Sequence, residues 1–522
     1  MVRARELPID IGASSLEMAE AIFGAGARVV SASYSGDYRS SGIYSNGDSL
    51  APGVTPGDSG LILSTGRAED FTNSNGQSNQ DTDTSTNTWG QSGNSTFNAA
   101  AGTWTYDASY LDVDFVPDGN VMTMQFVFAS EEYPEYQTGI YQDFVGVWIN
   151  GQQVQLEIGD GDADPNNLND ETNLNLYNDN TSDQYNTEMD GFTVTMTMTI
   201  PVTAGQVNSI RIGIADVSDS NYDSNLLIAA DSVQTALVAQ ADSVEIYPNG
   251  QADVDVLAND ENATGGSLTI THINGVAVSA GDTVTLATGQ QVTLNADGTL
   301  GVLGDGDVET VNFTYKVESS TGGSDTGFVT VGSVPCFVAG TRIATDTGPR
   351  LVEALRPGDR VRTRDHGFQP LRWIGVRTLA AEGDFAPVEI AANTFGRHAK
   401  LRVSPLHRVL LAAPGAELLF GEAEVLIAAK HLVDGASVRR VEGGEVTYVH
   451  LMFDRHEIVY SNGLPTESFL PGPRVRDLFE ADTLGEICAV FPELDPLTGE
   501  GYGPAARRIL DGREARALIL AA

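Results

Sequence analysis

FTVTMTMTIPV (residues 192–202) alternates apolar and polar side chains strictly, and SIRIGIADV (209–217) repeats the pattern. A period of two predicts strands that bury one face against a core. Two further runs rich in β-forming residues, VMTMQFVFAS (121–130) and DFVGVWING (143–151), are bounded by turn-forming residues. Residues 1–237 are therefore predicted to form a β-sandwich or jelly roll.

Two other features of this unit are predicted from local patterns. SLEMAEAIFGAGAR (15–28) places apolar residues at helical spacing after a serine, which predicts one short helix. The stretches 70–98 and 159–180 are long and polar. We expect them to be surface loops, because they are too long for tight turns and too polar for a core.

Two more units follow along the chain. Seven short strand-like runs at spacings near ten residues fill residues 238–333 and predict a small Ig-like sandwich that acts as a spacer. Residues 336–475 are again rich in strand-like runs, and residues 476–522 are predicted to be a mostly helical tail. The predicted fold class is all-β and multidomain.

Charge separates these units. The 522-residue chain has a net charge of −42, and residues 1–335 hold only 7 basic against 46 acidic side chains. Residues 336–522 hold 22 basic and 25 acidic side chains. So acidic a chain repels phosphate, which excludes nucleic acid and anionic membrane surfaces as partners.

Targeting signals are sparse. No run of 18 apolar residues predicts a membrane span, and the N-terminus lacks the apolar segment of a secretory signal. We expect a bacterial extracellular or cell-surface location, reached by a route without an N-terminal signal peptide. The two cysteines, Cys336 and Cys488, are too few for a disulfide framework.

The third unit contains groups for nucleophilic chemistry. A cysteine can attack the carbonyl that precedes it in the chain, which would convert the Pro335–Cys336 amide into a thioester. A nearby histidine would protonate the departing amine, and an aspartate would tune the thiol or activate the incoming nucleophile. Cys336, His407, Asp454 and His456 would supply these groups if the fold brings them together. The substrate would be the chain itself, and no cofactor is required.

Four blocks in this unit resemble the Hint (Hedgehog/intein) domain in its bacterial form: CFVAGTRI (336–343), LRPGD (355–359), SPLH (404–407) and FDRHEIVYSNG (453–463). The resemblance implies a horseshoe-like β-fold and single-turnover autocatalytic cleavage through a thioester. By motif, Cys336 is the nucleophile, and His407 destabilises the scissile bond with help from Ser404. Asp454 and His456 occupy the last block.

One departure from the intein pattern limits the expected reaction. Inteins end in His-Asn, whereas Glu467-Ser468 stands at the corresponding place, and about fifty residues still follow. Full splicing is therefore not expected, and cleavage before Cys336 is the favoured reaction. The alternative is an inactive Hint domain on a structural adhesin or matrix protein.

The first unit resembles the choice-of-anchor L domain through DSGLILSTG (58–66), FVFASEEYPEYQTGIYQDFVGVWING (126–151) and IADVSDSNYDSNLLI (214–228). That family implies a secreted, adhesive or matrix role without established catalysis, and its ligand is unknown. The second unit resembles cadherin-like or bacterial Ig-like spacers through DVDVLANDEN (253–262) and LNADGTL (294–300).

A metal site is a further expectation. Asp216, Asp219 and Asp223 lie along one acidic turn, and hard oxygen ligands favour Ca²⁺. Hydrogen bonds that stabilise the loop are the competing interpretation, and acid/base catalysis by paired carboxylates is a third. Cys488 is expected to be structural, and His366, His398 and His431 to be surface residues, since no histidine shows zinc-ligand spacing.

Overall fold

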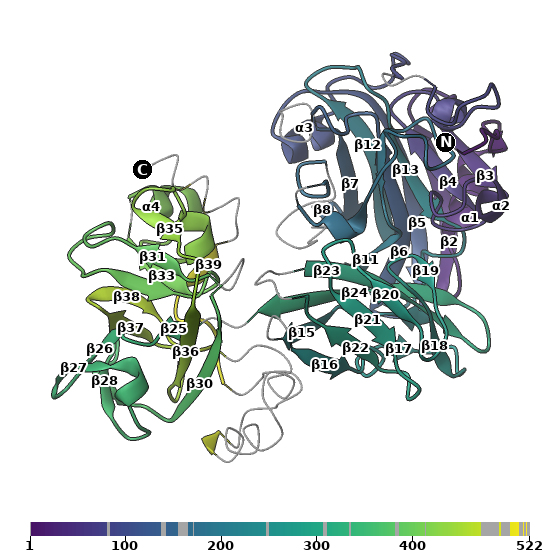
Figure 1. The fold of residues 1–522 in the computed structure, drawn as a ribbon. Coiled ribbons are helices and arrows are strands. Elements are labelled where there is room, and N and C mark those ends of the chain that lie inside the picture. Colours follow the sequence, from purple (N-terminus) through teal and green to yellow (C-terminus); the bar gives the residue numbers. More distant parts are fainter. Residues whose placement is uncertain are drawn as a thin grey trace.

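The structure is a computed structural model. It describes all residues except 1, 81–83, 137–141, 155–164, 171, 247–249, 306–310, 334–335, 382–385, 413, 471–489, 492–501, 511–514, 516–517 and 519–522. Strands make up most of the regular secondary structure of the described residues, which confirms the all-β prediction (Figure 1).

The first unit is a sandwich of two antiparallel sheets. The larger sheet has the order β1-β3-β4-β13-β6-β10-β9, with β11 also paired to β6. Its strands are β1 (Ile9–Asp10), β3 (Ser41–Ser45), β4 (Ser59–Ser64), β6 (Val121–Ser130), β9 (Tyr177–Asp179), β10 (Gly191–Thr193), β11 (Met196–Pro201) and β13 (Ser224–Ala229). The smaller sheet has the order β2-β5-β12-β7-β8. It contains β2 (Ala27–Ser35), β5 (Thr105–Pro117), β7 (Phe144–Ile149), β8 (Gln152–Gln153) and β12 (Asn208–Val217).

The core lies between these sheets because alternate side chains of both point inward. The inward residues of β6 include Met124, Phe126 and Phe128, and those of β12 include Ile210 and Ile212. The alternating run 192–202 forms two strands, β10 and β11, and both pair with β6. The alternation predicted from the sequence is thus confirmed, although the run is divided.

The predicted helix is shorter than its pattern. Helix α1 covers Ser15–Ile22, and Ser14 and Glu17 cap its N-terminus reciprocally. It ends before Gly26, whose φ of 81° is left-handed, and β2 begins at the next residue. The prediction of a helix to residue 28 was therefore wrong at its C-terminal end.

The two polar stretches are more ordered than predicted. Helix α3 (Ser95–Ala101) lies at the end of the first stretch, with Asn94 as its cap. In the second, Asn180 is fully buried, and its side-chain amide donates to the carbonyls of Thr187 and Met189. Amide side chains that satisfy buried backbone groups let a polar segment enter the interior. The remaining short helices here are α2 (Gly47–Leu50), η1 (Ala68–Phe71) and η2 (Leu174–Leu176).

The second unit forms the predicted Ig-like sandwich. Its sheets have the orders β15-β24-β23-β18-β19 and β16-β22-β21-β20, and β14 pairs with β17. The strands are β14 (Leu237–Val238), β15 (Asp242–Ile246), β16 (Gln251–Val254), β17 (Glu261–Asn262), β18 (Leu268–Ile273), β19 (Val276–Ala277), β20 (Thr283–Thr285), β21 (Gln291–Leu294), β22 (Leu300–Leu303), β23 (Val311–Ser319) and β24 (Ser324–Ser333).

A buried carboxyl joins the first two units. Asp325 on β24 accepts hydrogen bonds from the Ala239 N–H at 2.9 Å and from the Thr197 hydroxyl at 3.3 Å. Burial raises the pKa of Asp325 to about 7, because its effect outweighs that of several hydrogen bonds that lower the pKa. Beside it, the Gln125 side chain donates to the Ser324 carbonyl at 3.0 Å. Specific polar contacts therefore hold β6 and β11 against β24.

The third unit has two sheets (Figure 1). The first has the order β30-β36-β25-β32-β31-β35, and the second β29-β28-β26-β37-β38-β33-β34-β39, with β27 beside β26. The strands are β25 (Phe337–Val338), β26 (Arg342–Thr345), β27 (Gly348–Leu351), β28 (Arg360–Arg362), β29 (Phe368–Pro370), β30 (Trp373–Ala380), β31 (Val388–Ile390), β32 (Leu401–Val403), β33 (Arg408–Leu411), β34 (Val425–Ala428), β35 (Val438–Arg440), β36 (Glu445–Met452), β37 (Ile458–Ser461), β38 (Leu464–Glu467) and β39 (Arg508–Leu510). Helix α4 (Pro414–Phe420) and the turns η3 (Val352–Ala354) and η5 (Ala429–Leu432) complete it.

The C-terminal tail differs from its prediction. Residues 508–510 form strand β39, which pairs in parallel with β34, instead of helix, whereas Ala515 and Leu518 are helical as predicted. Tyr502 donates to the Phe453 carbonyl at 2.8 Å, so the tail packs onto the third unit. Pairing with an available sheet edge satisfies more backbone groups than an isolated helical turn would. Most other residues of the tail, Cys488 included, lie outside the described residues.

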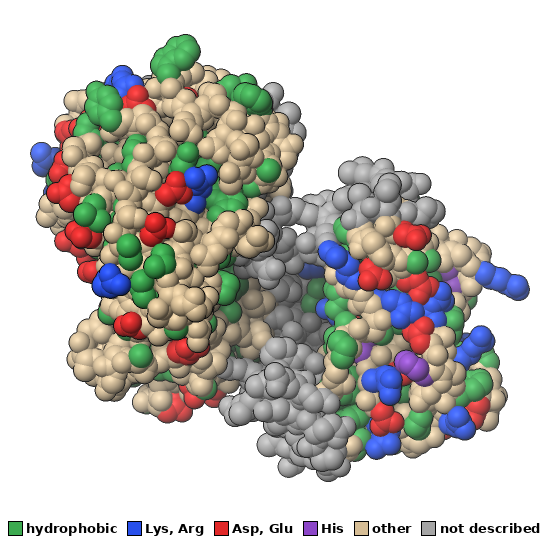
Figure 2. Space-filling view, turned by 180° about the vertical axis from the view of Figure 1, so that it is seen from behind, with side chains coloured by type: hydrophobic (Ala, Val, Ile, Leu, Met, Phe, Trp, Pro, Cys, Tyr) green, Lys and Arg blue, Asp and Glu red, His purple; other side chains and the backbone are tan. Residues whose placement is uncertain are grey.

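Figure 2 shows the charge division on the surface. Arg and Lys side chains gather on the third unit, whereas the larger body formed by the first two units carries mostly acidic and neutral ones. Among the residues that the structure describes, no helix is both long enough and apolar enough to cross a bilayer.

The contact at Asp325 provides a stability prediction. Asp325→Ala should lower the free energy of unfolding of the first two units by about 1–3 kcal/mol, because the Ala239 N–H stays buried without its acceptor. Calorimetric unfolding of the full chain would measure the change. Asp118→Ala, at an exposed turn of the first unit, is the control and should change stability by less than about 0.5 kcal/mol. Equal effects of the two substitutions would contradict this account of the contact.

Candidate active site

Cys336 lies at the start of the central strand of a sheet. It directly precedes β25, which pairs with β32 on one side and β36 on the other. The side chain is buried, and its Sγ is 3.3 Å from Nε2 of His450 on β36. A thiol and an imidazole at this distance can share a proton, which is the first requirement for a cysteine nucleophile.

Ser404 holds the backbone of Cys336 from the opposite side. The Cys336 N–H donates to Ser404 Oγ at 2.8 Å, and the Ser404 N–H donates to the Cys336 carbonyl at 3.0 Å. Ser404 directly follows β32, so the pairing of β25 with β32 brings this contact about. The amide nitrogen of the predicted scissile bond is thus fixed by a hydroxyl. Pro335, on the other side of that bond, lies outside the described residues.

The side chain of His407 is buried and makes no hydrogen bond to the described residues. Neither ring nitrogen has a partner among the described residues, and the ring packs 4.4 Å from the Phe337 ring, centroid to centroid. Burial lowers the pKa of His407 to about 4, and Glu467 only partly opposes this. His407 is therefore neutral at pH 7. Ser404 therefore lies at the nitrogen of the predicted scissile amide, and the role of His407 beside that amide stays a prediction because Pro335 lies outside the described residues.

A buried ionic cluster adjoins His407. Glu467 is fully buried and accepts hydrogen bonds from Arg408, from its N–H at 2.8 Å and from Nη1 at 3.0 Å. Nε2 of His456 is 3.4 Å from Glu467 Oε2 and 3.1 Å from the Ser468 carbonyl. Burial raises the pKa of Glu467, but Arg408, His456 and His407 outweigh it and lower the pKa to about 2.

The tail fixes the tautomer of His456. The Ala506 N–H donates to His456 Nδ1 at 3.0 Å, so a neutral His456 carries its proton on Nε2, toward Glu467 and the Ser468 carbonyl. The imidazole of His456 and the ionised Glu467 therefore form a hydrogen-bonded support behind His407. The predicted site residue His456 lies in this support, and the structure gives no contact between it and Cys336.

Asp454 does not join the site. Its side chain is 54% exposed and lies 3.4 Å from Arg372 Nε. Sequence adjacency to His456 made it a candidate, but the turn between β36 and β37 directs it to solvent. His450, by contrast, was missed. On β36 it lies two residues from Tyr448, which packs against Cys336. Residues two apart on a strand face the same side, and this alternation was the signal that could have revealed His450.

The other histidines are structural. His366 is exposed and contacts Glu457 at 2.9 Å, and His431 is half-buried. His398 was expected at the surface but is buried, where its ring bonds to the Ala399 carbonyl at 2.7 Å and accepts from the Phe395 N–H at 3.2 Å.

The three predicted metal ligands are not assembled. Asp216 and Asp223 are buried, while Asp219 is half-exposed and accepts from the Asn221 N–H at 3.0 Å. Across the described residues, no group of three or more His, Cys, Asp or Glu side chains is placed to hold one metal ion. As a set, Asp216, Asp219 and Asp223 therefore do not form the predicted site.

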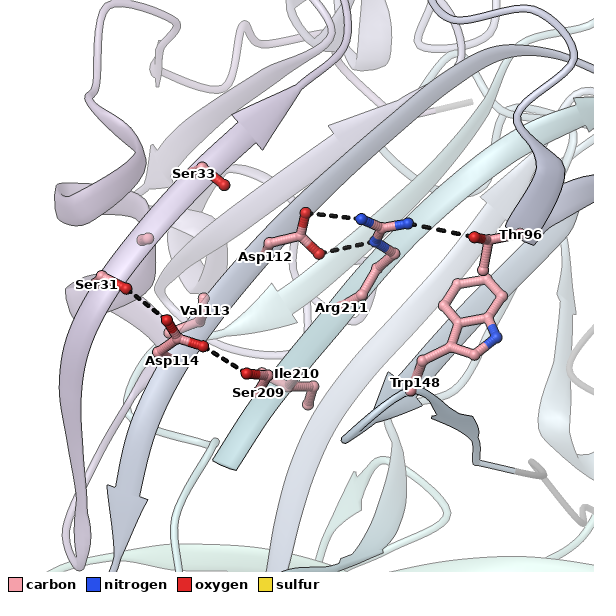
Figure 3. Close-up of a pocket in the computed structure, with 12 residues that line it drawn as sticks. Ser31, Ser33, Thr96, Asp112, Val113, Asp114, Trp148, Ser209, Ile210 and Arg211 are labelled. Carbon is pink, nitrogen blue, oxygen red and sulfur yellow. Dashed lines mark hydrogen bonds and ion pairs between the residues drawn. The ribbon is translucent and has the colours of Figure 1, made fainter. Parts of the chain in front are cut away.

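A cleft of about 480 Å³ opens on the outer face of the smaller sheet of the first unit (Figure 3). Arg211 donates to both carboxylate oxygens of Asp112, at 2.7 and 2.9 Å, and Asp114 accepts from Ser31 and Ser209. These residues are cross-strand neighbours in register, so their contacts stabilise the sheet. They leave no uncompensated carboxylate in the cleft for acid/base chemistry.

Residues 335–473 match the family model described as the Hint domain. Residues 13–234 match that of the Choice-of-anchor L domain, and residues 234–332 that of a bacterial Ig domain. The three resemblances predicted from the sequence are thereby confirmed. The matches describe a modular protein that joins a surface-type domain to one of the autoprocessing type.

Solved structures provide weaker likenesses. The gp41-1 intein is 11% identical, with 25% of this chain covering 97% of that one at a TM-score of 0.17. The M60 catalytic domain with CBM51 domains of Clostridium perfringens ZmpB is 9% identical. That match covers 85% of this chain and 43% of that one with a TM-score of 0.14. Extracellular domains 3–5 of Drosophila OTK are 11% identical, and the match covers 63% of this chain and 85% of that one with a TM-score of 0.15. No curated protein matches the chain.

The buried ion cluster provides a prediction with a definite pH sign. Because its folded pKa is about 2, Glu467 stabilises the third unit fully above its unfolded pKa of about 4.3, and this contribution is lost as pH falls toward 2. Glu467→Gln should cost about 3 kcal/mol at pH 7, and the difference from wild type should shrink below about pH 4. Denaturant unfolding across pH would measure it. Asp454→Asn, at an exposed carboxyl, should show neither effect, and a pH-independent loss in Glu467→Gln would contradict the ionic role.

Proposed function

We propose that the Hint domain cleaves its own chain once, at the Pro335–Cys336 bond, through a thioester of Cys336. The observation that carries the proposal is the 3.3 Å contact between Cys336 Sγ and His450 Nε2 in a site where Ser404 fixes the backbone of the same cysteine. Burial of both side chains keeps bulk water from competing for the thiol proton.

The proposed step balances protons within the site. His450 Nε2 accepts the thiol proton, and the thiolate attacks the carbonyl carbon of residue 335 to form a new C–S bond. When the C–N bond breaks, the proton passes from the His450 imidazolium to the departing α-amine of Cys336. Water or an amine then attacks the thioester and releases the thiol.

His407 has a separate role in this proposal. The neutral imidazole of His407, which packs on Phe337 and has no partner among the described residues, can donate one hydrogen bond to the scissile amide as the bond breaks. Glu467 would stabilise positive charge that develops on His407, because its ionised carboxylate already favours the charged form of that ring. His456 and Arg408 hold Glu467 in place.

The first prediction for this function concerns fragments. The purified chain should yield residues 1–335 and 336–522, which intact mass spectrometry would detect. Cys336→Ala should abolish cleavage, because no other group on the chain can form the ester at that bond. Cleavage at the same bond in Cys336→Ala would indicate an outside protease, and a stable intact wild type would favour an inactive domain on a structural adhesin.

The second prediction compares variants of His450 and Ser404 with a control variant of Asp454. His450→Gln should slow cleavage by about 10²–10⁴-fold, the range for loss of a general base. Ser404→Ala should slow it by about tenfold, because one hydrogen bond to the reacting amide is lost. Asp454→Asn should cleave at the wild-type rate, since its side chain faces solvent. Rates come from the time course of fragment masses. A fast His450→Gln variant or a slow Asp454→Asn variant would contradict the assignment.

We also propose that the first two units act outside the cell, as a secreted adhesive or matrix module that cleavage releases or transfers. The match to the Choice-of-anchor L domain and the 46 acidic against 7 basic side chains of residues 1–335 support this. Fractionation of the native host with an antibody to the first unit tests it. Recovery in the cytosolic fraction alone would contradict it.

A further inference from the structure

Buried carboxyl groups meet at one end of the first sandwich. The register explains why: Ser130 of β6 pairs with Ser224 of β13 in one sheet, and Phe144 of β7 pairs with Ala215 of β12 in the other. The residues beside these pairs are acidic. We call Glu131, Asp143, Asp216 and Asp223 the acidic cluster.

All four side chains of the acidic cluster are at most 4% exposed. Asp143, Asp216 and Asp223 each retain one buried carboxylate oxygen that has no hydrogen-bond partner in the described part of the chain. Neither oxygen of Glu131 has a partner of normal geometry, although the Thr84 hydroxyl is close enough to lower its pKa. Buried polar atoms of this kind are rare in folded proteins and point to a missing partner.

Among the residues that the structure describes, no positive side chain compensates the cluster. The neighbouring charges that most affect these four groups are all carboxylates, among them Asp190, Glu132 and Asp107. Burial and this repulsion raise the pKa of Glu131 to about 10 and that of Asp223 to about 7. The Hint domain solves the same problem differently, because Arg408 and His456 pair with Glu467.

Two aspartates of the cluster contact each other directly. Asp143 and Asp216 are in hydrogen-bonding contact with each other, which two ionised carboxylates cannot maintain. Asp143 also accepts from the Val217 N–H at 3.3 Å. The pair therefore needs a shared positive charge, either a proton or a cation.

The surroundings supply the neutral oxygens that a hard cation needs. The hydroxyl of Ser224 contacts Asp143, and that of Thr65 contacts Asp216. Ca²⁺ takes six to eight oxygens from carboxylates, hydroxyl or carbonyl groups and water, so two carboxylates suffice where neutral oxygens complete the shell.

We propose that Asp143 and Asp216 bind one Ca²⁺ ion at this end of the sandwich, and that Asp223 and Glu131 are the neighbouring carboxyl groups. The site replaces the Asp219-containing set predicted from the sequence. It is independent of the cleavage chemistry, because every residue in it belongs to the first unit.

The test uses the full chain with Cys336→Ala, which keeps it in one piece. After chelation with EDTA, calorimetry would follow unfolding with Ca²⁺ or with Mg²⁺ at the same concentration. At a hundredfold excess over Kd, Ca²⁺ should raise the melting temperature of the first unit by about 5–10 °C, and Mg²⁺ should raise it much less. An unchanged melting temperature in Ca²⁺ would overturn the proposal, because the pair would then share a proton.

Matched variants locate the site. Asp216→Asn should lose the Ca²⁺ response while melting no lower than its parent in EDTA, because the substitution removes a repulsive buried charge. A merely structural aspartate would instead melt lower in both conditions. Asp219→Asn, in the same turn but half-exposed, should keep the full response. A full response in Asp216→Asn would overturn the assignment.

A second measurement covers the case in which Asp216→Asn does not fold. Tb³⁺, a luminescent substitute for Ca²⁺, should bind the Cys336→Ala chain and be displaced by Ca²⁺ with a stoichiometry of one. Asp143→Asn should abolish this signal. Binding that persists in Asp143→Asn, or no binding to the parent chain, would contradict the site.

Discussion

The placement of one short strand between two neighbours determines the chemistry of the third unit. β25 contains only two residues, yet it pairs with β32 and β36 on either side. The ends of those two strands supply Ser404 and His450, so the same backbone pairing that stabilises the sheet fixes Cys336 on both sides. A register shift of one residue would turn the thiol to the opposite face, away from the imidazole.

The units that differ in charge composition also differ in how they stabilise buried charge. In the third unit, buried charge is paired: Glu467 is enclosed by Arg408, His456 and His407, and its pKa is lowered to about 2. In the first unit, carboxyl groups are buried with one another, and their pKa values rise. A buried carboxylate is stable only with a positive partner. The described residues supply that partner in the third unit, whereas in the first unit they supply none to the acidic cluster.

Much of the architecture could be predicted from the sequence because it depends on local periodicity. Alternation in 192–202 and 209–217 correctly indicated half-buried strands, and Cys336 and Ser404 were found because they occupy spaced motif blocks. Residues that act through long-range pairing were harder to identify. His450 reaches Cys336 across a register that no local pattern specifies, whereas Asp454 is adjacent to His456 in sequence and still faces solvent. The predicted set of metal ligands was wrong for the same reason. Asp216, Asp219 and Asp223 are close in sequence because one turn contains them. Sheet pairing instead brings Asp216 next to Asp143.

The account's central claim is that Cys336 forms a thioester with residue 335. The most direct measurement is intact mass spectrometry of the N-terminal fragment after the chain is incubated with hydroxylamine. The account predicts a fragment of residues 1–335 that ends in a hydroxamic acid, formed faster than the free acid appears without hydroxylamine, and absent from Cys336→Ala. A fragment that carries only a free carboxylate at the same rate in both conditions would contradict it, because hydrolysis would then bypass the thioester.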